Sequence, residues 1–287
     1  MNDLIDLCHH HGLHDVAYDM YVGCGKPDCA DCKLRPIISR QGNKYQMRDL
    51  IVPLIPPHKV YVEPFAGTAA IFFQLPKAEV SVLNDLDKHT YNFLRRIQHA
   101  PLDVSSYPNP PRTLEALKKQ FTKKQKTTQD KIVHELIRSC CGFNTQIVNE
   151  PTQIYLRRQI SMKVAKIQSL KEKLEGVKIL NEDYADVIRK YDSKDSFFFI
   201  DPPYENSAGR LGYAETSEFD FDRLKNVLHG IQGKFLMTIN NSPHIRKLFK
   251  EFHQKKFVAK TSLIQSKKFL SNPYVRTELF ISNYTLP

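Results

Sequence analysis

The 287-residue sequence lacks any apolar stretch approaching the roughly 20 residues that span a bilayer, so no membrane span is expected. Its first residues, Met1 to His11, lack both a basic region and a long apolar core, which argues against a secretory signal. Six cysteines are too few for a disulfide scaffold in a chain of this size, so a reducing, intracellular setting is expected. The dinucleotide fingerprint G-x-G-x-x-G is also absent, which makes a dehydrogenase a poor hypothesis.

The composition, with 41% hydrophobic and 25% charged residues, is that of an ordinary globular protein. Its length suits one large α/β domain, or one domain with a sizeable insertion. The formal net charge of +11 is less ordinary and predicts a polyanionic partner, with nucleic acid as the first candidate. Surface lysine also serves solubility, which is the alternative explanation. The charge is unevenly spread along the chain, which favours nucleic acid.

Cysteine and histidine are concentrated in residues 1–35. Cys29 and Cys32 form a C-x-x-C knuckle, and Cys24 lies just upstream. Three thiols so close together predict a structural Zn²⁺ site, with Cys8 or one of the neighbouring histidines as the fourth ligand. Free thiols in a loop and a redox pair remain open as alternatives. Zinc at this place would stabilise a small unit rather than take part in chemistry.

The most informative stretch is Asp201-Pro202-Pro203-Tyr204, which follows the apolar run Phe197 to Ile200. The run predicts a buried strand, and the two prolines predict a rigid loop directly after it. Ligands of open α/β sheets bind beyond the carboxyl ends of the strands, so a site is expected here. Tyr204 can stack on a flat ring, while Asp201 and the Pro202 carbonyl can accept the hydrogens of an exocyclic amine. A proline-stiffened surface turn is the alternative.

Two earlier segments predict the first units of an alternating α/β sheet. Val60 to Val62 predicts a strand that enters the small-residue turn at 63–70, and a helix is expected from Ile71 onward. Glu79 to Leu83 predicts the second strand, which is followed by Asp85. An acidic residue at that position can bind ribose hydroxyls or cap the next helix, and both roles can hold together.

The remaining elements are expected on the same grounds of periodicity and turn chemistry. Helices are predicted at Gln46 to Ile55, from Ala185, at Phe221 to Leu228 and at Pro243 to Phe252, and strands at Val177 to Leu180, Lys234 to Ile239, Phe257 to Leu263 and Glu278 to Asn283. Lys44, in the turn before the first helix, is either a solvated charge or the partner of a carboxylate.

Residues 96–177 interrupt the alternation and are predicted to be mainly helical and strongly basic. A charged helix face is often simply solvated. The position of this stretch, between two halves of a sheet, favours a module that contacts phosphates. The nucleic-acid contacts are expected from Lys123, Lys124, Lys126, Arg157 and Arg158.

Taken together and in order, these residues resemble the Dam-like, alpha-group adenine-specific DNA methyltransferases, a family marked by the Asp-Pro-Pro-Tyr motif. The resemblance rests on Gln41 to Lys44, Val62 to Gly67, Asn84-Asp85, Asn181 to Asp183, Phe199 to Tyr204, Phe235 to Asn240 and Glu278 to Tyr284. It implies an α/β fold with a Rossmann-like class I methyltransferase sheet at 36–95 and 178–287. Residues 96–177 would then be an inserted target-recognition domain, and residues 1–35 a small Cys/His-rich segment outside the common core.

The resemblance also implies a cofactor, a substrate and roles for individual residues. The expected reaction is site-specific methyl transfer from S-adenosylmethionine to N6 of an adenine flipped out of double-stranded DNA. Lys44 and the loop with Arg40 would contact the methionine part of the cofactor, and Phe65 and Gly67 would line the cofactor. Asp85 would bind the cofactor ribose, and Asp183 would lie near the cofactor adenine. Asp201 to Tyr204 would hold the target base. The sequence departs from the family at Arg40, where an aromatic is usual, and at Ala69, where a glycine is usual.

Other functions remain open at this point. A flat exocyclic amine is also present on cytosine and on adenine in RNA, so transfer to cytosine N4 or to RNA fits the same motif. A nucleic-acid-binding protein that has lost catalysis is the alternative from another class. A companion restriction nuclease, the oligomeric state and the recognition sequence are not decided by the sequence.

Overall fold

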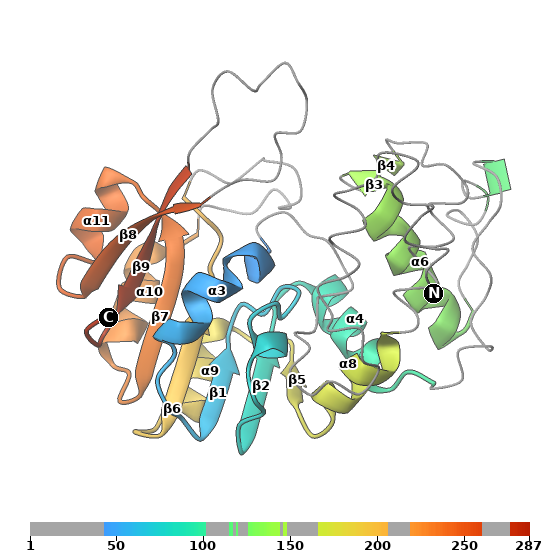
Figure 1. Ribbon diagram of the computed structural model, residues 1–287, viewed down its shortest axis with the longest axis horizontal. Helices are drawn as coiled ribbons and strands as arrows, with labels where there is room; N and C mark the ends of the chain where they lie inside the picture. The colour runs from blue at the N-terminus through green and yellow to red at the C-terminus, as the bar shows by residue number, and fades with distance from the viewer. Residues whose placement is uncertain are drawn as a thin grey trace, which may run out of the picture. The chain divides into compact units, whose positions relative to one another are not determined.

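The structure is a computed structural model that describes residues 43–101, 115–116, 119, 126–143, 146–147, 166–205, 219–259 and 276–287. Within these ranges seven strands form one sheet in the order β5-β2-β1-β6-β7-β9-β8 (Figure 1). The strands are β1 (Val60–Glu63), β2 (Val80–Asn84), β5 (Lys178–Leu180), β6 (Ser196–Ile200), β7 (Lys234–Asn240), β8 (His253–Ala259) and β9 (Arg276–Ser282).

The pairing directions identify the sheet as doubly wound. β5, β2, β1, β6 and β7 are parallel to their neighbours, whereas β9 runs antiparallel to both β7 and β8. The strand order reverses between β1 and β6, which is where ligands bind in sheets of this kind. The expected Rossmann-like sheet is therefore confirmed, with one antiparallel strand between β7 and β8.

Helices connect the strands and cover the sheet. The helical elements of the described ranges, with η for a 3-10 helix, are η1 (Lys44–Met47), α3 (Arg48–Ile51), η2 (Val52–Leu54), η3 (Phe72–Gln74), α4 (Lys88–Gln98), α6 (Thr128–Cys141), α8 (Ile167–Leu174), α9 (Tyr184–Tyr191), α10 (Phe221–His229) and α11 (Pro243–Leu248). In this part of the chain no helix is both long enough and apolar enough to cross a membrane.

The core lies on both faces of the central strands. On one face Val62 and Phe198 pack in a single cluster with Leu224 of α10 and Ile245 of α11. The alternate positions of the same strands point the other way. There the ring of Tyr61 stacks on Phe197 with 6.1 Å between centroids, and these rings are buried. β6 is buried along its whole length, as a central parallel strand requires.

Several elements differ from their sequence-based expectations. The expected helix from Ile71 is only the short η3, because Pro76 follows closely and prevents a longer helix. The expected helix over 46–55 is a succession of 3-10, α and 3-10 turns, with Pro53 inside the run. The expected helix from Pro243 ends at Leu248, because pairing with β9 starts β8 already at His253.

Residues 96–177 were expected to be mainly helical, and the described part of this stretch includes a departure from that pattern. α6 and α8 are helices, but Gly142–Phe143 and Gln146–Ile147 form a short antiparallel pair, β3 and β4. α8 is fixed beside α4 by Gln98, whose amide donates to the Leu174 and Val177 carbonyls at 2.8 Å. The Lys171 amine, 2.7 Å from the Ala100 carbonyl, likewise joins α8 to the end of α4 instead of facing solvent.

Candidate active site

The loop that begins at Asp201 leaves the carboxyl end of β6, at the point where the strand order reverses. Pro202 is buried, while Asp201 and Tyr204 are partly exposed. A buried central strand thus carries a stiff loop to the edge of the sheet, which is the position the sequence predicted for it.

The carboxylate of Asp201 is held by two side chains from distant parts of the chain. The Lys44 amine lies 2.7 Å from its Oδ1 and 2.9 Å from its Oδ2. The Thr238 hydroxyl donates to Oδ1 at 2.9 Å. Lys44 is 5% exposed and Asp201 22%, so the pair is shielded from water but not sealed. A carboxylate bridged in this way keeps a fixed plane and still offers free lone pairs.

Lys44 therefore pairs with a carboxylate, one of its two expected roles, and it also touches the neighbouring ring. Its amine lies 4.8 Å from the centroid of Tyr204, within cation–π range. The Tyr204 hydroxyl donates to Glu278 Oε2 at 2.6 Å. One buried cation thus links the carboxylate and the aromatic ring of the motif.

The turn after β1 places Gly67 opposite Asp85. The Gly67 amide donates to Asp85 Oδ2 at 2.8 Å, and the Asp87 amide donates to Asp85 Oδ1 at 2.9 Å. Gly67 has a φ of 51°, and a Cβ on it would meet nothing within 4 Å. A ligand can therefore approach this backbone closely. The alternative role of Asp85 as a helix cap is wrong: α4 begins at Lys88, and Asp87 caps it.

Ala69, the position where the family usually has glycine, also has a left-handed backbone, with a φ of 52°. Its side chain is fully buried. This conformation costs a non-glycine residue about 1–2 kcal/mol. The chain thus keeps the backbone of a glycine turn although one glycine is absent.

Asn84, the last residue of β2, joins two loops at the carboxyl edge. Its side-chain amide donates to the Pro64 and Glu182 carbonyls at 3.0 Å, and its Oδ1 accepts from the Glu182 amide at 2.9 Å. The residue is 1% exposed. Because it satisfies backbone groups of the loops after β1 and β5, Asn84 holds those loops in register with β2.

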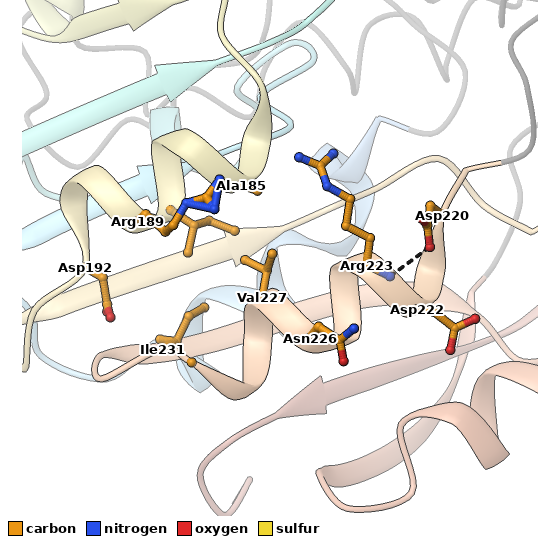
Figure 2. A pocket seen from close by; sticks show the side chains of 11 residues that line it. Ala185, Arg189, Asp192, Asp220, Asp222, Arg223, Asn226, Val227 and Ile231 are labelled. Atoms are coloured by element: carbon orange, nitrogen blue, oxygen red, sulfur yellow. Dashed lines mark hydrogen bonds between the residues drawn. The ribbon is translucent and has the colours of Figure 1, made fainter.

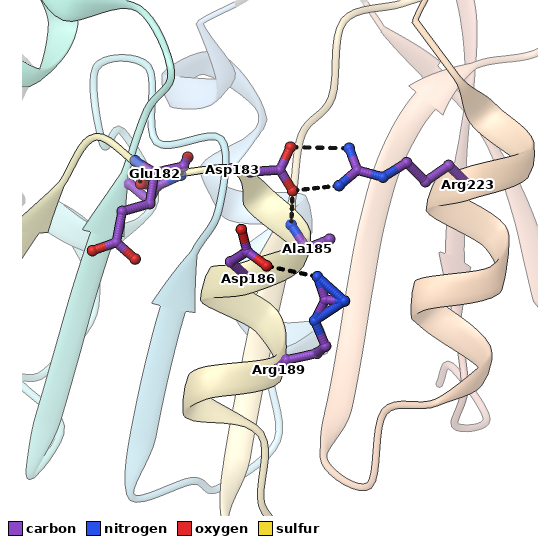
Figure 3. A network of polar contacts seen from close by, with 7 residues as sticks. Glu182, Asp183, Ala185, Asp186, Arg189 and Arg223 are labelled. Atoms are coloured by element: carbon purple, nitrogen blue, oxygen red, sulfur yellow. Dashed lines mark hydrogen bonds and ion pairs between the residues drawn. The ribbon is translucent and has the colours of Figure 1, made fainter.

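Asp183 forms a bidentate ion pair with Arg223 of α10 (Figure 3). The two nitrogen–oxygen distances are 2.9 and 2.7 Å, and Asp183 Oδ1 also caps α9 at the Ala185 amide. The hydrogen bonds from Arg223 hold the pKa of Asp183 below its usual range. Arg223 was not anticipated from the sequence, and it is the partner that any ligand of Asp183 would have to share.

An aromatic cluster lies beside this pair. The Phe65 ring is 5.0 Å from Tyr184 and 5.8 Å from Phe219, measured between centroids. The Arg223 guanidinium lies 4.9 Å from the Tyr184 centroid. Phe65, expected to line the cofactor, is therefore part of a group of tilted and edge-to-face rings that links the turn after β1 to α9 and α10.

A pocket of about 560 Å³ lies between α9 and α10 (Figure 2). Ile188, Val227 and Ile231 contribute apolar surface, and Arg223 lies at its edge. Its Asp192 carboxylate already accepts the Gln232 and Gly233 amides. The Asp201 loop does not line it.

Glu63, the last residue of β1, is a buried carboxyl group that two uncharged donors hold within the described part of the chain. Its Oε1 accepts the Tyr61 hydroxyl at 2.7 Å and the Phe72 amide at 2.8 Å. Burial raises the pKa of Glu63 to about 8, although both hydrogen bonds act against that rise and the nearby Asp201 charge adds to it. Glu63 thus links η3 to β1, and its carboxyl group is largely protonated at neutral pH.

Residues 41–263 match the family of D12 class N6 adenine-specific DNA methyltransferases. The chain belongs to the D12 class of N6 adenine-specific DNA methyltransferases. It is an S-adenosylmethionine-dependent methyltransferase, and membership of the D12 class supports DNA adenine methylation as its function.

The D12-class chain is similar over its length to one curated relative. It is 22% identical over 262 residues to the Type II methyltransferase M.CviBI of Paramecium bursaria Chlorella virus NC1A, covering 88% of this chain and 100% of the relative. Among solved structures, an S-adenosylmethionine-dependent methyltransferase of Agrobacterium tumefaciens overlays with a TM-score of 0.38 at 13% identity, covering 88% of this chain and 63% of the other. A Thermoplasma acidophilum protein gives 0.36 at 9% identity, covering 84% and 86%. The fold assignment rests on the strand order and not on these overlays.

Other residues expected to act in this D12-class protein lie outside the described residues. They are Arg40 of the cofactor loop, Lys123, Lys124, Arg157 and Arg158 of the basic insertion, and Cys8, Cys24, Cys29 and Cys32 of the expected zinc site. Lys126 is described and exposed. Where the structure does describe the chain, no cluster of three metal-binding side chains is found.

Sequence reasoning missed Thr238, Asn240 and Glu278, which contact the loop after β6 in the candidate site of this D12-class protein. All three lie on β7 or β9, and Asn240 pairs with Glu278 across these strands. Polar residues near the ends of otherwise buried strands were the available signal, because a buried polar group needs a partner. Their common partner, the loop after β6, becomes evident only from the strand order.

Proposed function

We propose that the protein transfers a methyl group from S-adenosylmethionine to the N6 amine of an adenine that has left the DNA duplex. The observation that carries this proposal is the Asp201 carboxylate, held by Lys44 and Thr238 next to the Tyr204 ring. An oriented hydrogen-bond acceptor beside an aromatic ring suits a flat base with an exocyclic amine. Membership of the D12 class supports adenine as that base.

The chemistry needed from these residues is mainly positioning. The lone pair of an adenine amine is delocalised into its ring, so the amine is a poor nucleophile until it is turned towards the acceptor. Asp201 and the Pro202 carbonyl accept the two amine hydrogens and direct the lone pair, and Asp201 or water takes the proton released as the new bond forms. Bound S-adenosylmethionine would supply the methyl group from its sulfonium, whose sulfur–methyl bond breaks to leave a neutral thioether.

Residues at the neighbouring strand ends fit this cofactor. The open space at Gly67 leaves its backbone accessible, and Asp85, already fixed by two amides, has an orientation suited to ribose hydroxyls. Phe65 and Asp183 would contact the adenine end, with Arg223 sharing Asp183. Arg40 and Lys44 complete the proposed set.

The proposed partner is double-stranded DNA, with residues 96–177 as the target-recognition domain. Tyr204 would stack on the flipped base and offset part of the flipping cost of a few kcal/mol. The basic residues Lys123, Lys124, Lys126, Arg157 and Arg158 would contact phosphates. Binding should then weaken steeply as salt rises, because phosphate contacts release counterions.

The test is transfer of labelled methyl from S-adenosylmethionine to unmethylated DNA, followed by digestion and identification of the labelled nucleoside. Wild type should produce N6-methyladenine, and Asp201→Ala should bind the cofactor more weakly than wild type and produce none. Label in N4-methylcytosine, or transfer to RNA alone, would replace the proposal by one of these other acceptors. Full turnover by Asp201→Ala would remove Asp201 from the chemistry.

A further inference from the structure

Tyr204 is fixed at its hydroxyl end by a residue of another strand. The hydroxyl donates to Glu278 Oε2 at 2.6 Å, although the two residues are 74 positions apart in the sequence. Glu278 is only 8% exposed. A hydroxyl–carboxylate hydrogen bond this short is in the charge-assisted range and about twice as strong as a neutral one. The ring plane of Tyr204 is therefore set by β9.

The loop is held a second time by the strand next to β9. Asn240 of β7 lies opposite Glu278 in the register of the two strands. Its Oδ1 accepts the backbone amide of Glu205 at 3.0 Å. Two facing side chains thus hold consecutive loop residues, Tyr204 by its hydroxyl and Glu205 by its backbone, which fixes both the path of the loop and the tilt of the ring.

The Tyr204 ring also attracts positive charge. The Lys44 amine lies 4.8 Å from the Tyr204 centroid while it pairs with Asp201. A phenol that donates to a carboxylate has a more electron-rich ring, which attracts a cation more strongly. An amine that accepts a methyl group becomes positively charged as the bond forms, so a ring of this kind favours the transition state over the bound base.

We propose that Glu278 is a positioning residue for methyl transfer, which acts through the Tyr204 hydroxyl to fix and polarise the ring beside the target base. This inference rests on the proposed function, because it requires a base between Tyr204 and Asp201. Glu278 of β9 then affects the rate of methyl transfer rather than the affinity for DNA.

The experiment compares wild type, Glu278→Gln, Tyr204→Phe and the double variant on plasmid DNA that wild type methylates, at saturating S-adenosylmethionine. Glu278→Gln keeps the shape of the side chain and a neutral hydrogen bond. Its kcat should fall about tenfold, which is the difference between a charged and a neutral hydrogen bond. The Kd for the plasmid should change less than threefold.

The double variant tests whether Glu278 acts through the hydroxyl. Once Tyr204→Phe has removed that group, adding Glu278→Gln should cause no further fall in kcat. Thr277→Val is the matched control, because Thr277 is the neighbour of Glu278 on β9 and its hydroxyl accepts from the Asn241 amide at 3.1 Å. Its kcat should equal that of wild type.

The outcomes separate this inference from the proposed function. If wild type labels DNA and Glu278→Gln keeps the wild-type kcat, or lowers it equally in both backgrounds, the role of Glu278 is overturned while the proposed function stands. A fall in kcat for Thr277→Val as large as for Glu278→Gln would also overturn it, because a general disturbance of β9 would then explain both. If wild type transfers no methyl group to DNA, both fail together.

Discussion

The loop after β6 and the turn after β1 leave adjacent strands at the same edge of the sheet, yet they are held by different means. The loop after β6 is held by side chains from distant elements: Lys44 of η1, Thr238 and Asn240 of β7, and Glu278 of β9. These contacts include a partly buried ion pair and a hydrogen bond to a carboxylate, so the shape of this loop depends on charged groups.

The turn after β1 depends instead on backbone conformation and on local partners. Gly67 and Ala69 both have a positive φ, and the Ala69 amide closes the turn on the Ala66 carbonyl at 2.6 Å. The Asn84 carbonyl accepts the Ala66 amide, and the Asp85 carboxylate accepts the Gly67 amide. A turn that presents backbone suits a cofactor, whereas a loop that presents an oriented carboxylate suits the group that reacts.

The largest effect is expected when the cation that pairs with the loop after β6 is removed, because this loop depends on an ion pair and the turn after β1 depends on backbone conformation and local partners. Lys44→Met keeps the length of the side chain and deletes its charge, which leaves Asp201 with the Thr238 hydroxyl. A small misplacement of a reacting group can cost 10²-fold, so single-turnover transfer should slow by about 100-fold or more. Denaturant unfolding should show that the variant still folds, because Asp201 retains some solvent access.

Lys59→Met serves as the control for Lys44→Met, because Lys59 is exposed and lies just before β1. It should transfer methyl groups at the wild-type rate. A wild-type rate for Lys44→Met would show that the orientation of Asp201 does not depend on the ion pair. It would contradict the statement that charged groups hold the loop after β6.

The same contrast explains what the sequence could and could not predict. β6 differs from its predicted run by one residue, because a buried parallel strand is a continuous apolar run that ends where polar residues begin. The position of Asp201 follows from that end. The turn at Gly67 was equally visible, because small residues after a strand permit only a tight turn with an accessible backbone.

The contacts of the loop after β6 were not predictable, because they depend on which strands are neighbours. Glu278 reaches Tyr204 only because β9 inserts antiparallel beside β7, and single-sequence patterns do not give strand order. The capping role of Asp85 failed for a related reason: its carboxylate reaches across to Gly67, while Asp87 caps α4. The Asp85 carboxylate thus accepts backbone amides outside α4, and the amide in the first turn of α4 is left to Asp87.

A second prediction concerns Glu63, which fixes η3 below the turn after β1 without a cation. Its pKa of about 8 exceeds the ordinary value of 4.5, so the unfolded chain releases this proton at a lower pH than the folded chain. The carboxyl group therefore stabilises the fold fully below pH 4.5, and that contribution declines as the pH rises towards 8. Glu63→Gln lacks the titration, so its stability relative to wild type should increase over this window by roughly a few kcal/mol.

Urea unfolding at pH 5 and pH 8 measures this change for wild type, Glu63→Gln and the control Glu79→Gln. Glu79 is exposed and immediately precedes β2, so its variant should follow the wild-type pH profile. A constant difference between wild type and Glu63→Gln at the two pH values would mean that Glu63 ionises in the folded protein as it does in the unfolded chain.

The smallest expected effect separates the two left-handed residues of the turn. Gly67→Ala adds a Cβ that meets no protein atom, so the only cost to stability is the backbone strain of about 1–2 kcal/mol. The same Cβ enters the space next to which the cofactor is proposed to bind, so the affinity for S-adenosylmethionine should fall as well.

Ala69→Gly relieves a similar backbone strain. It also removes a buried methyl group worth about 0.8 kcal/mol and increases the conformational entropy of the unfolded chain. These terms nearly cancel, and unfolding and cofactor titration should both place Ala69→Gly within about 1 kcal/mol of wild type. If Ala69→Gly instead stabilised the protein by several kcal/mol, the turn would be far more strained than its dihedral angle implies.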